Sequence, residues 1–249
     1  MVKDLIKVHP YTDQEKVAIL ALKYNLKSIP VVDEENLFLG AVPSDIILDI
    51  LHSEDIEDFL RSAGISKYNT LTNKIFQASP VILTKLRLPW LLLGFFGCLF
   101  ATQIVKFFEA PLQAHFVLAA FIPLIVYMAD AVGTQTEILF IRSLVYRLDI
   151  KKYFLKEIKV SFFIALILGT LLTLISYFWI KLPKIGIILG ISLFLTIINA
   201  FLLGLLVPYF LNKLKKDPAI ASGPVGTIIR DILSLIIYFS VASLLLKIF

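Results

Sequence analysis

Long apolar stretches alternate with short polar connections over residues 88–249. A helix needs about 20 mostly apolar residues to cross a bilayer, and five of these stretches are long enough. The pattern therefore predicts a transmembrane domain of five helices, over approximately residues 88–108, 114–146, 160–180, 185–211 and 224–249.

The second stretch is too long for one straight span. It contains Pro123 and the weak helix former Gly133, so we expect a bent or discontinuous helix. Irregular backbone at membrane depth is tolerated where it is buried in protein or lines a watery cavity.

Residues 1–52 have the mixed periodicity of a small α/β unit. We expect strands at 4–8, 28–32 and 37–42, a helix at 13–24 capped by Thr12, and a second helix at 44–51. About fifty residues form a poor independent core, so the unit is expected to need a partner.

Residues 53–87 connect the two parts. Ser53 is expected to cap a short acidic helix that ends near Gly64. An amphipathic segment over residues 70–83 is expected to lie on the membrane surface or at the mouth of a pore, with a plain spacer as the alternative.

Composition supports this division. The chain is 58% hydrophobic, above the roughly 45–50% of soluble domains. Residues 1–69 hold twelve acidic and seven basic side chains, a net charge of −5, whereas residues 70–249 hold seven and seventeen, a net of +10. Because these bases flank apolar spans, they do not indicate nucleic-acid binding.

The distribution of Lys and Arg predicts the orientation. Most of these residues precede the first span or lie in the second–third and fourth–fifth connections. The opposite side has Lys106, Lys181, Lys184 and Lys247. The positive-inside rule therefore places the N-terminus in the cytosol and the C-terminus outside. No cleavable signal peptide is expected, because the N-terminus leads into mixed polar sequence.

Nothing in the sequence supports an enzyme. It contains no His-Glu-x-x-His, Gly-x-Ser-x-Gly or phosphate-loop motif. With Cys98 as its single cysteine, the chain cannot form an internal disulfide.

Asp231 is a carboxylate within the otherwise apolar residues 226–246, beside Arg230. A charge at membrane depth costs at least about 2.5 kcal/mol and usually faces a water-filled path or a partner. Thr227 and Ser234 lie one turn before and after it and extend a polar stripe. The stripe predicts a cation path, and the alternative is a structural ion pair with Arg230 or Arg142.

Asp130, Thr134 and Glu137 are spaced i, i+4 and i+7, which places them on one helix face. This face would line the same path or form a second cation or proton site. The alternatives are pairing with Arg230 or a location near the cytosolic mouth.

Two known families resemble this chain. Ser28-Ile29-Pro30-Val31-Val32-Asp33 and Gly40-Ala41-Val42-Pro43-Ser44-Asp45, within residues 4–51, resemble one cystathionine-β-synthase-type (CBS) repeat. The membrane part resembles the MgtE family of magnesium channels. The resemblance rests on Leu88-Pro89-Trp90-Leu91, Phe107-Phe108-Glu109-Ala110, Phe121-Ile122-Pro123-Leu124-Ile125, Val132-Gly133-Thr134-Gln135 and Asp217-Pro218-Ala219-Ile220-Ala221-Ser222-Gly223-Pro224.

The MgtE resemblance implies a homodimer in the lipid bilayer, with a pore for magnesium or similar divalent cations on its axis. The second and fifth helices would line the pore. Asp231 would hold a hydrated ion, Asp217 would lie at the inner mouth, and residues 70–83 would form a plug helix. The helix face of Asp130 and Glu137, rather than the resemblance, predicts these two acids as further metal ligands. The predicted pore-lining residues are Gly133, Thr134, Gln135, Thr227 and Ser234.

The chain also departs from both family patterns. MgtE proteins usually have Gly-Gly-Asn where this chain has Ala129-Asp130-Ala131, and a small residue where it has Glu137. The wall thus loses an amide and gains two carboxylates. The chain matches one CBS repeat, without the first repeat and the N-terminal helical domain of the family. The ribose-binding positions of that repeat hold Pro43 and Ile46, so we expect weak nucleotide binding or none, and no organic cofactor.

Three functions follow as hypotheses. The first is gated conduction of magnesium, the second is a proton- or sodium-coupled exchanger using Asp130 and Glu137, and the third is a cation sensor that transports nothing. For the gate, we expect two subunits to pair their CBS units. Magnesium would then bind at Asp33, Glu34, Glu35, Glu54, Asp55, Glu57 and Asp58 and favour the closed state.

Overall fold

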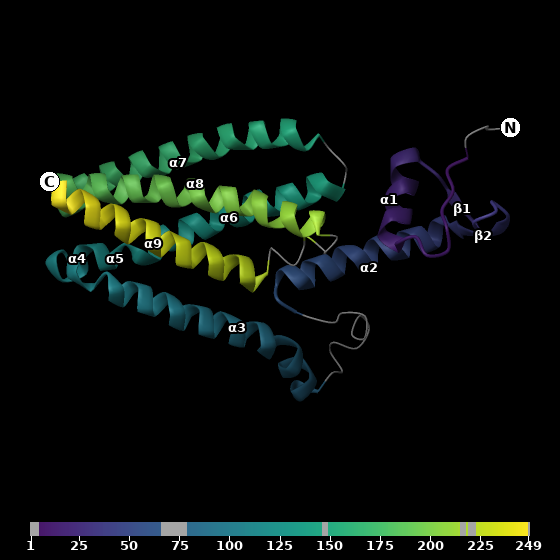
Figure 1. Cartoon of the computed structure of the whole chain (residues 1–249), viewed down its shortest axis with the longest axis horizontal. Helices are drawn as coiled ribbons and strands as arrows, with labels where there is room; N and C mark the ends of the chain where they lie inside the picture. Colours follow the sequence, from purple (N-terminus) through teal and green to yellow (C-terminus); the bar gives the residue numbers. More distant parts are fainter. Residues whose placement is uncertain (1–4, 66–78, 146–148, 215–217, 219–222, 249) are drawn as a thin grey trace. The chain divides into compact units, whose positions relative to one another are not determined.

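The computed structural model describes residues 5–65, 79–145, 149–214, 218 and 223–248. The chain divides into two compact units, Met1–Leu60 and Arg61–Phe249. The first contains the predicted α/β elements and the second the apolar helices, so the predicted fold class is confirmed (Figure 1).

Unit 1 is built on a two-stranded antiparallel sheet. Strands β1 (Ser28–Val32) and β2 (Phe38–Pro43) pair with Ile29 opposite Val42. Helices α1 (Gln14–Tyr24) and α2 (Ser44–Ser62) follow the expected order. Ile29 and Val32 are the buried residues of β1, and Ile29 joins side chains of both helices in one small apolar core. That core consists of Val8, Val17, Ala18, Ala21, Ile29 and Ile47.

The predicted first strand and the predicted cap of α1 were wrong in detail. Val8 forms only an isolated parallel bridge with Val31 in the described part of residues 4–8. Asp13 caps α1 by accepting from the Glu15 N–H, whereas the Thr12 hydroxyl oxygen accepts from the His9 N–H. Both side chains satisfy backbone donors, but only Asp13 is adjacent to the first helical residue.

The boundary expected between residues 52 and 53 falls inside α2, which continues without a break to Ser62. Ser53 was predicted to cap a second helix. Its hydroxyl instead donates to the Ile50 carbonyl at 2.9 Å, an arrangement that a helix interior accommodates. Gly64, with φ of +74°, lies just beyond the helix, as the sequence predicted.

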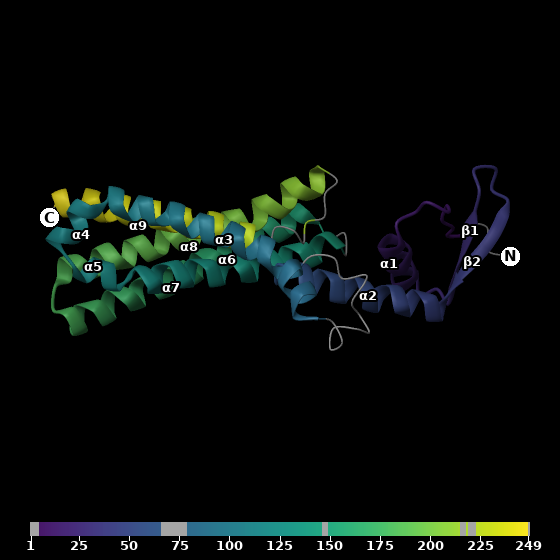
Figure 2. The same cartoon turned by 90° about the horizontal axis from the view of Figure 1, so that it is seen from below.

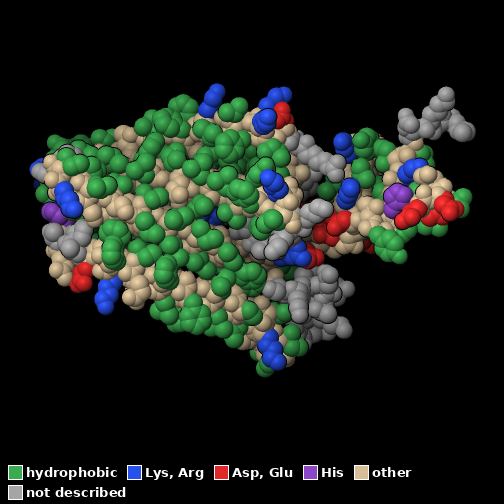
Figure 3. Space-filling view, viewed as in Figure 1, with side chains coloured by type: hydrophobic (Ala, Val, Ile, Leu, Met, Phe, Trp, Pro, Cys, Tyr) green, Lys and Arg blue, Asp and Glu red, His purple; other side chains and the backbone are tan. Residues whose placement is uncertain are grey.

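Unit 2 contains the five long apolar helices that the hydrophobic pattern predicted. They are α3 (Pro80–Phe107), α6 (Ile122–Val145), α7 (Ile150–Ile180), α8 (Pro183–Lys213) and α9 (Pro224–Ile248). On the face drawn in Figure 3, hydrophobic side chains cover most of this unit and most of the visible Lys and Arg lie towards the ends of the helices. This distribution suits a bilayer, where apolar surface meets lipid and basic side chains reach the headgroups.

The second span is discontinuous, as expected. The short helices α4 (Glu109–Ala114) and α5 (Val117–Ala120) precede α6, and the break falls at Phe121. The Tyr238 hydroxyl, on α9, donates to the Leu118 carbonyl at 2.8 Å. Gly133 causes no break, since α6 continues through it.

Helix α8 is the centre of unit 2 and packs against α6, α7 and α9. Glycines allow the closest approaches: a Cβ added at Gly204 would lie 2.6 Å from the Gly133 carbonyl oxygen on α6. Helix α3 lies along α9 in both views and buries none of its own residues (Figure 2).

The connecting segment is only partly described. Residues 70–78 of the expected amphipathic segment lie outside the described residues. Residues 80–83 are instead the first turn of α3, which therefore begins eight residues before the predicted start of the span. Pro80 at its first position suits a helix start, because that N–H has no partner within the helix.

Candidate functional site

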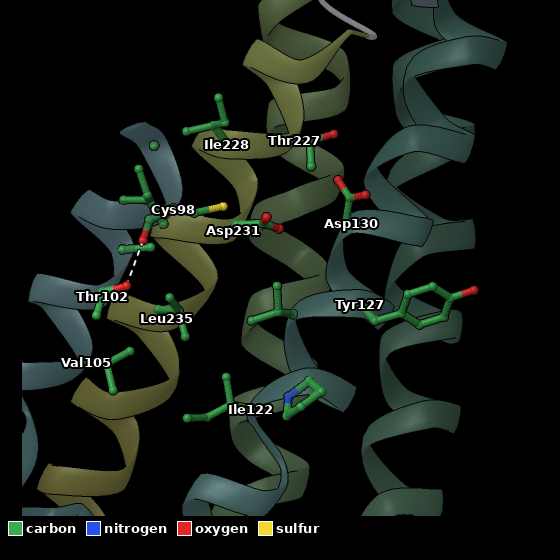
Figure 4. Close-up of a pocket in the computed structure, with 15 residues that line it drawn as sticks. Cys98, Thr102, Val105, Ile122, Tyr127, Asp130, Thr227, Ile228, Asp231 and Leu235 are labelled. Atoms are coloured by element: carbon green, nitrogen blue, oxygen red, sulfur yellow. Dashed lines mark hydrogen bonds between the residues drawn. The ribbon is translucent and has the colours of Figure 1, made fainter. Parts of the chain in front are cut away.

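A groove of about 530 Å³ lies between α3, α6 and α9. Its walls are mostly apolar. The polar side chains that line it are Cys98 and Thr102 from α3, Tyr127 and Asp130 from α6, and Thr227 and Asp231 from α9 (Figure 4). The groove thus brings two carboxylates from different helices into one apolar setting.

Asp231 is directed into this groove. Figure 4 shows its carboxylate on α9, and that of Asp130 on α6, turned towards the space between the two helices. The side chain is half-buried, and no hydrogen bond or ion pair joins it to any residue in the described part of the chain. A half-buried carboxylate without a protein partner is suited to bind a cation or ordered water.

Arg230 points to a different side of α9 from Asp231, because consecutive helical residues are about 100° apart. It is 2% exposed, and its guanidinium binds four oxygens. Nε donates to Asp130 Oδ1 at 2.8 Å, and Nη1 donates to Glu137 Oε2 at 2.6 Å. Nη2 donates to Thr134 Oγ1 at 3.0 Å and to Thr227 Oγ1 at 3.4 Å.

The two acids that bind Arg230 differ in their exposure. The Glu137 side chain is 1% exposed and does not line the groove, whereas the Asp130 side chain is 29% exposed and does. A buried charge needs a paired, hydrogen-bonded environment, and Arg230 supplies it for both acids.

These contacts decide between alternatives that the sequence left open. Asp130, Thr134 and Glu137 do share one face, but that face meets Arg230. In the structure the Glu137 carboxylate is an ion-pair partner of Arg230, which is the alternative that the sequence offered, and its role as a metal ligand stays a prediction. Asp130 contacts Arg230 and also faces the groove, so it can be an ion-pair partner and a metal ligand.

Of the five residues predicted to line a pore, Thr227 lines the groove. Thr134 contacts Arg230, and Gly133 is buried where the Arg230 stem passes. Gln135 is exposed elsewhere on α6. Ser234 is fully buried, because it lies one turn after Arg230 and shares its side of the helix.

Sequence reasoning missed three groove residues, Cys98, Thr102 and Tyr127. A signal was present, since Cys98 and Thr102 are spaced i, i+4 on an apolar helix. The Thr102 hydroxyl donates a hydrogen bond to the Cys98 carbonyl at 2.9 Å.

In the described part of the chain, no three His, Cys, Asp or Glu side chains are grouped so that they could hold an ion together. Asp217 lies outside the described residues. The predicted regulatory acids are likewise not gathered into such a group: Asp33 Oδ1 accepts from the Glu35 and Leu37 N–H groups, and Glu54 Oε1 accepts from Gln14 Nε2 at 2.6 Å.

Comparisons with known proteins relate the chain to a transporter family. The sequence model of the MgtE family, described as a divalent cation transporter, matches residues 122–241, which include Asp130, Arg230 and Asp231. The chain is 37% identical over 243 residues to the magnesium transporter MgtE of Bacillus subtilis (strain 168), covering 96% of this chain and 53% of that protein.

Two further relatives carry the same name. The identity is 34% over 247 residues for the protein of Thermus thermophilus and 30% over 249 residues for that of Enterococcus faecalis; each match covers 98% of this chain and 54% of the relative. The chain thus spans about half the length of these curated relatives. Residues 122–241 therefore form a domain of the MgtE family, and nearly the whole chain is related in sequence to the magnesium transporters of that name.

Proposed function

We propose that this chain conducts magnesium across a membrane and that Asp231 holds the hydrated ion on its path. The proposal rests on the Asp231 carboxylate. This group lies on a membrane-spanning helix, faces the groove between α3, α6 and α9, and has no partner among the described residues. The names of the relatives supply the choice of magnesium.

Magnesium loses its water reluctantly, so proteins usually hold it through one or two carboxylates and retained waters. Asp231 and Asp130 offer such ligands without requiring dehydration. Oxygen ligands that bind an ion weakly through its water also let it leave, as conduction requires.

The path is proposed to lie on the axis of a homodimer. Support comes from the Asp231 carboxylate, which faces the groove and has no partner among the described residues of its own chain. A second copy would present its own Asp231 across the two-fold axis, and the two carboxylates would face one hydrated ion. An isologous arrangement of this kind is the commonest form of homo-oligomer.

Conduction is preferred over proton- or sodium-coupled exchange because of Arg230. The exchanger hypothesis relies on Asp130 and Glu137 as coupling sites, but both carboxylates accept hydrogen bonds from this guanidinium. A coupling ion would have to displace a tethered cation from a buried site.

Orientation and gating belong to the same proposal. In this proposal the N-terminus is cytosolic and the acids of unit 1 bind magnesium between two copies. Protease protection of residues 1–87 should then increase at millimolar magnesium. If protection stays constant, unit 1 is not a magnesium sensor.

Ion flux in proteoliposomes tests the central claim. Asp231→Asn should lower magnesium flux at least tenfold while dimer assembly is retained. The matched control is Asp149→Asn, a change at the N-cap of α7 where Asn also accepts backbone hydrogen bonds. Wild-type flux in a folded Asp231→Asn protein would overturn the assignment.

The same vesicles separate the other hypotheses. A conducting path passes magnesium down its gradient without a second ion. Flux that requires an imposed proton or sodium gradient would establish the exchanger. Magnesium binding without any flux would establish the sensor.

A further inference from the structure

Arg230 joins two carboxylates through a planar, rigid group. Its Nε and Nη1 atoms each donate to one carboxylate, Asp130 and Glu137 respectively. Because the guanidinium presents its donors in a fixed fork, the two carboxylates are held in a fixed relation to one another.

The two ends of this bridge lie in different surroundings. At one end Glu137 is 1% exposed and away from the groove; at the other Asp130 is 29% exposed and lines it. A buried partner loses little further mobility on pairing, so Glu137 acts as the anchor and Asp130 is the end presented to the groove.

Helix α6 is shaped to accept this bridge. A Cβ at Gly133 would lie 2.5 Å from Cδ and 3.1 Å from Nε of Arg230. Because Gly133 has no side chain, space is left for the aliphatic part of Arg230 to pack against α6, where the guanidinium reaches Asp130 and Glu137. This observation is independent of the hydrogen bonds.

We propose that Arg230, anchored by Glu137, is a positioning residue that holds the Asp130 carboxylate opposite Asp231 and thereby favours divalent over monovalent cations. This inference rests on the proposed function, since it concerns the ion that Asp231 holds. The oxygen of Asp130 that does not bind Arg230 and the carboxylate of Asp231 both face the groove, so holding Asp130 in place keeps a second carboxylate beside the ion.

A fixed pair of carboxylates discriminates by charge. A divalent cation gains twice the Coulomb energy of a monovalent cation at the same distances, but only if the carboxylates stay in place. Arg230 also limits the local charge: three carboxylates and one guanidinium sum to a formal −2 per chain, against −3 without it. A less negative path holds the ion less tightly and lets it leave.

The test is the ratio of magnesium flux to potassium flux in proteoliposomes. Arg230→Met combined with Glu137→Met replaces the buried pair by apolar groups of similar length, which commonly preserves folding. We expect the folded double variant to lose at least fivefold of this flux ratio, chiefly through a gain in potassium flux. An unchanged ratio would overturn the proposal.

A matched control tests whether the role of Arg230 is purely structural. Tyr238→Phe removes the hydrogen bond to the Leu118 carbonyl and so loosens α9 without touching the acids. It should lower the thermal midpoint and leave the flux ratio as in the wild type. If this variant lowers the ratio equally, selectivity follows stability and the positioning role is refuted.

If the double Met variant does not assemble, the Glu137→Gln variant tests the positioning role instead. Gln keeps the shape and one acceptor but removes the charge that anchors Arg230. A lower flux ratio supports the proposal, and a wild-type ratio refutes it.

Asp231→Asn in the same vesicles separates the two proposals. If it leaves magnesium flux intact, the proposed function fails. If it removes the flux while the double Met variant keeps its ratio, only the positioning role fails.

Discussion

The ion pair between Arg230 and Glu137 should dominate the stability of the contact between α6 and α9. Both side chains are almost fully buried, at 2% and 1% exposed, and their atoms lie 2.6 Å apart. Removing one member of such a pair leaves an uncompensated buried charge and costs about 3–5 kcal/mol. Arg230→Met, which strands Glu137 and frees Asp130, is therefore expected near the upper part of that range.

The structure also ranks the related variants. Glu137→Gln removes a charge-assisted hydrogen bond but leaves Asp130 as a partner of Arg230, so a cost of about 1.5–3 kcal/mol is expected. Asp130→Asn should cost about 1 kcal/mol, because that side chain is 29% exposed and its charge is screened by solvent. Arg230→Met with Glu137→Met should lie within about 1 kcal/mol of the wild type, since only the partly exposed Asp130 loses its partner.

The assay is reversible unfolding of the purified protein in detergent micelles, followed by far-ultraviolet circular dichroism. The single variants Arg230→Met and Glu137→Met and the double variant form a cycle, in which the double variant should cost clearly less than the sum of the two single variants. If the double variant is no more stable than Arg230→Met alone, the pair is not the source of the cost. If Asp130→Asn costs as much as Arg230→Met, the burial argument is wrong.

Two further predictions concern packing and access. Gly204→Ala should cost about 1–3 kcal/mol in the same unfolding assay, because its methyl group would meet the Gly133 carbonyl oxygen at 2.6 Å; Gly94→Ala, with nothing within 4 Å, is the control and should be neutral or stabilising. A positively charged thiol reagent should modify the exposed Cys98 in the groove beside Asp231 and lower magnesium flux. Cys98→Ser should be resistant, and equal inhibition of both proteins would place the groove off the path.

The sequence determined the architecture of unit 2 because hydrophobicity acts over whole segments. About twenty apolar residues in a row cannot be accommodated outside a bilayer or a large core, so the five spans were readable without coordinates. The discontinuity of the second span was also readable, from its excess length and Pro123. Turn and strand positions in unit 1 followed from local chemistry, as in the hairpin closed by Asp33.

The sequence did not decide which of two suitable hydrogen-bonding groups takes a given role. Thr12 and Asp13 both satisfy the composition of a cap, and only the backbone geometry assigns that role to Asp13. Ser53 likewise has two partners available, a helix N-terminus or a preceding carbonyl, and in the structure it donates to the Ile50 carbonyl while α2 continues to Ser62.

The candidate site shows the same division. Sequence alone placed Asp130, Thr134 and Glu137 on one face and Asp231 on a neighbouring helix, because helical spacing fixes faces. It did not decide which acid meets Arg230, since residues 130 and 230 are distant in sequence and the rotation of α9 against α6 is set by packing. That rotation turns Arg230 and Ser234 inward and Asp231 outward, so tertiary structure decided which carboxylate is neutralised and which remains open to an ion.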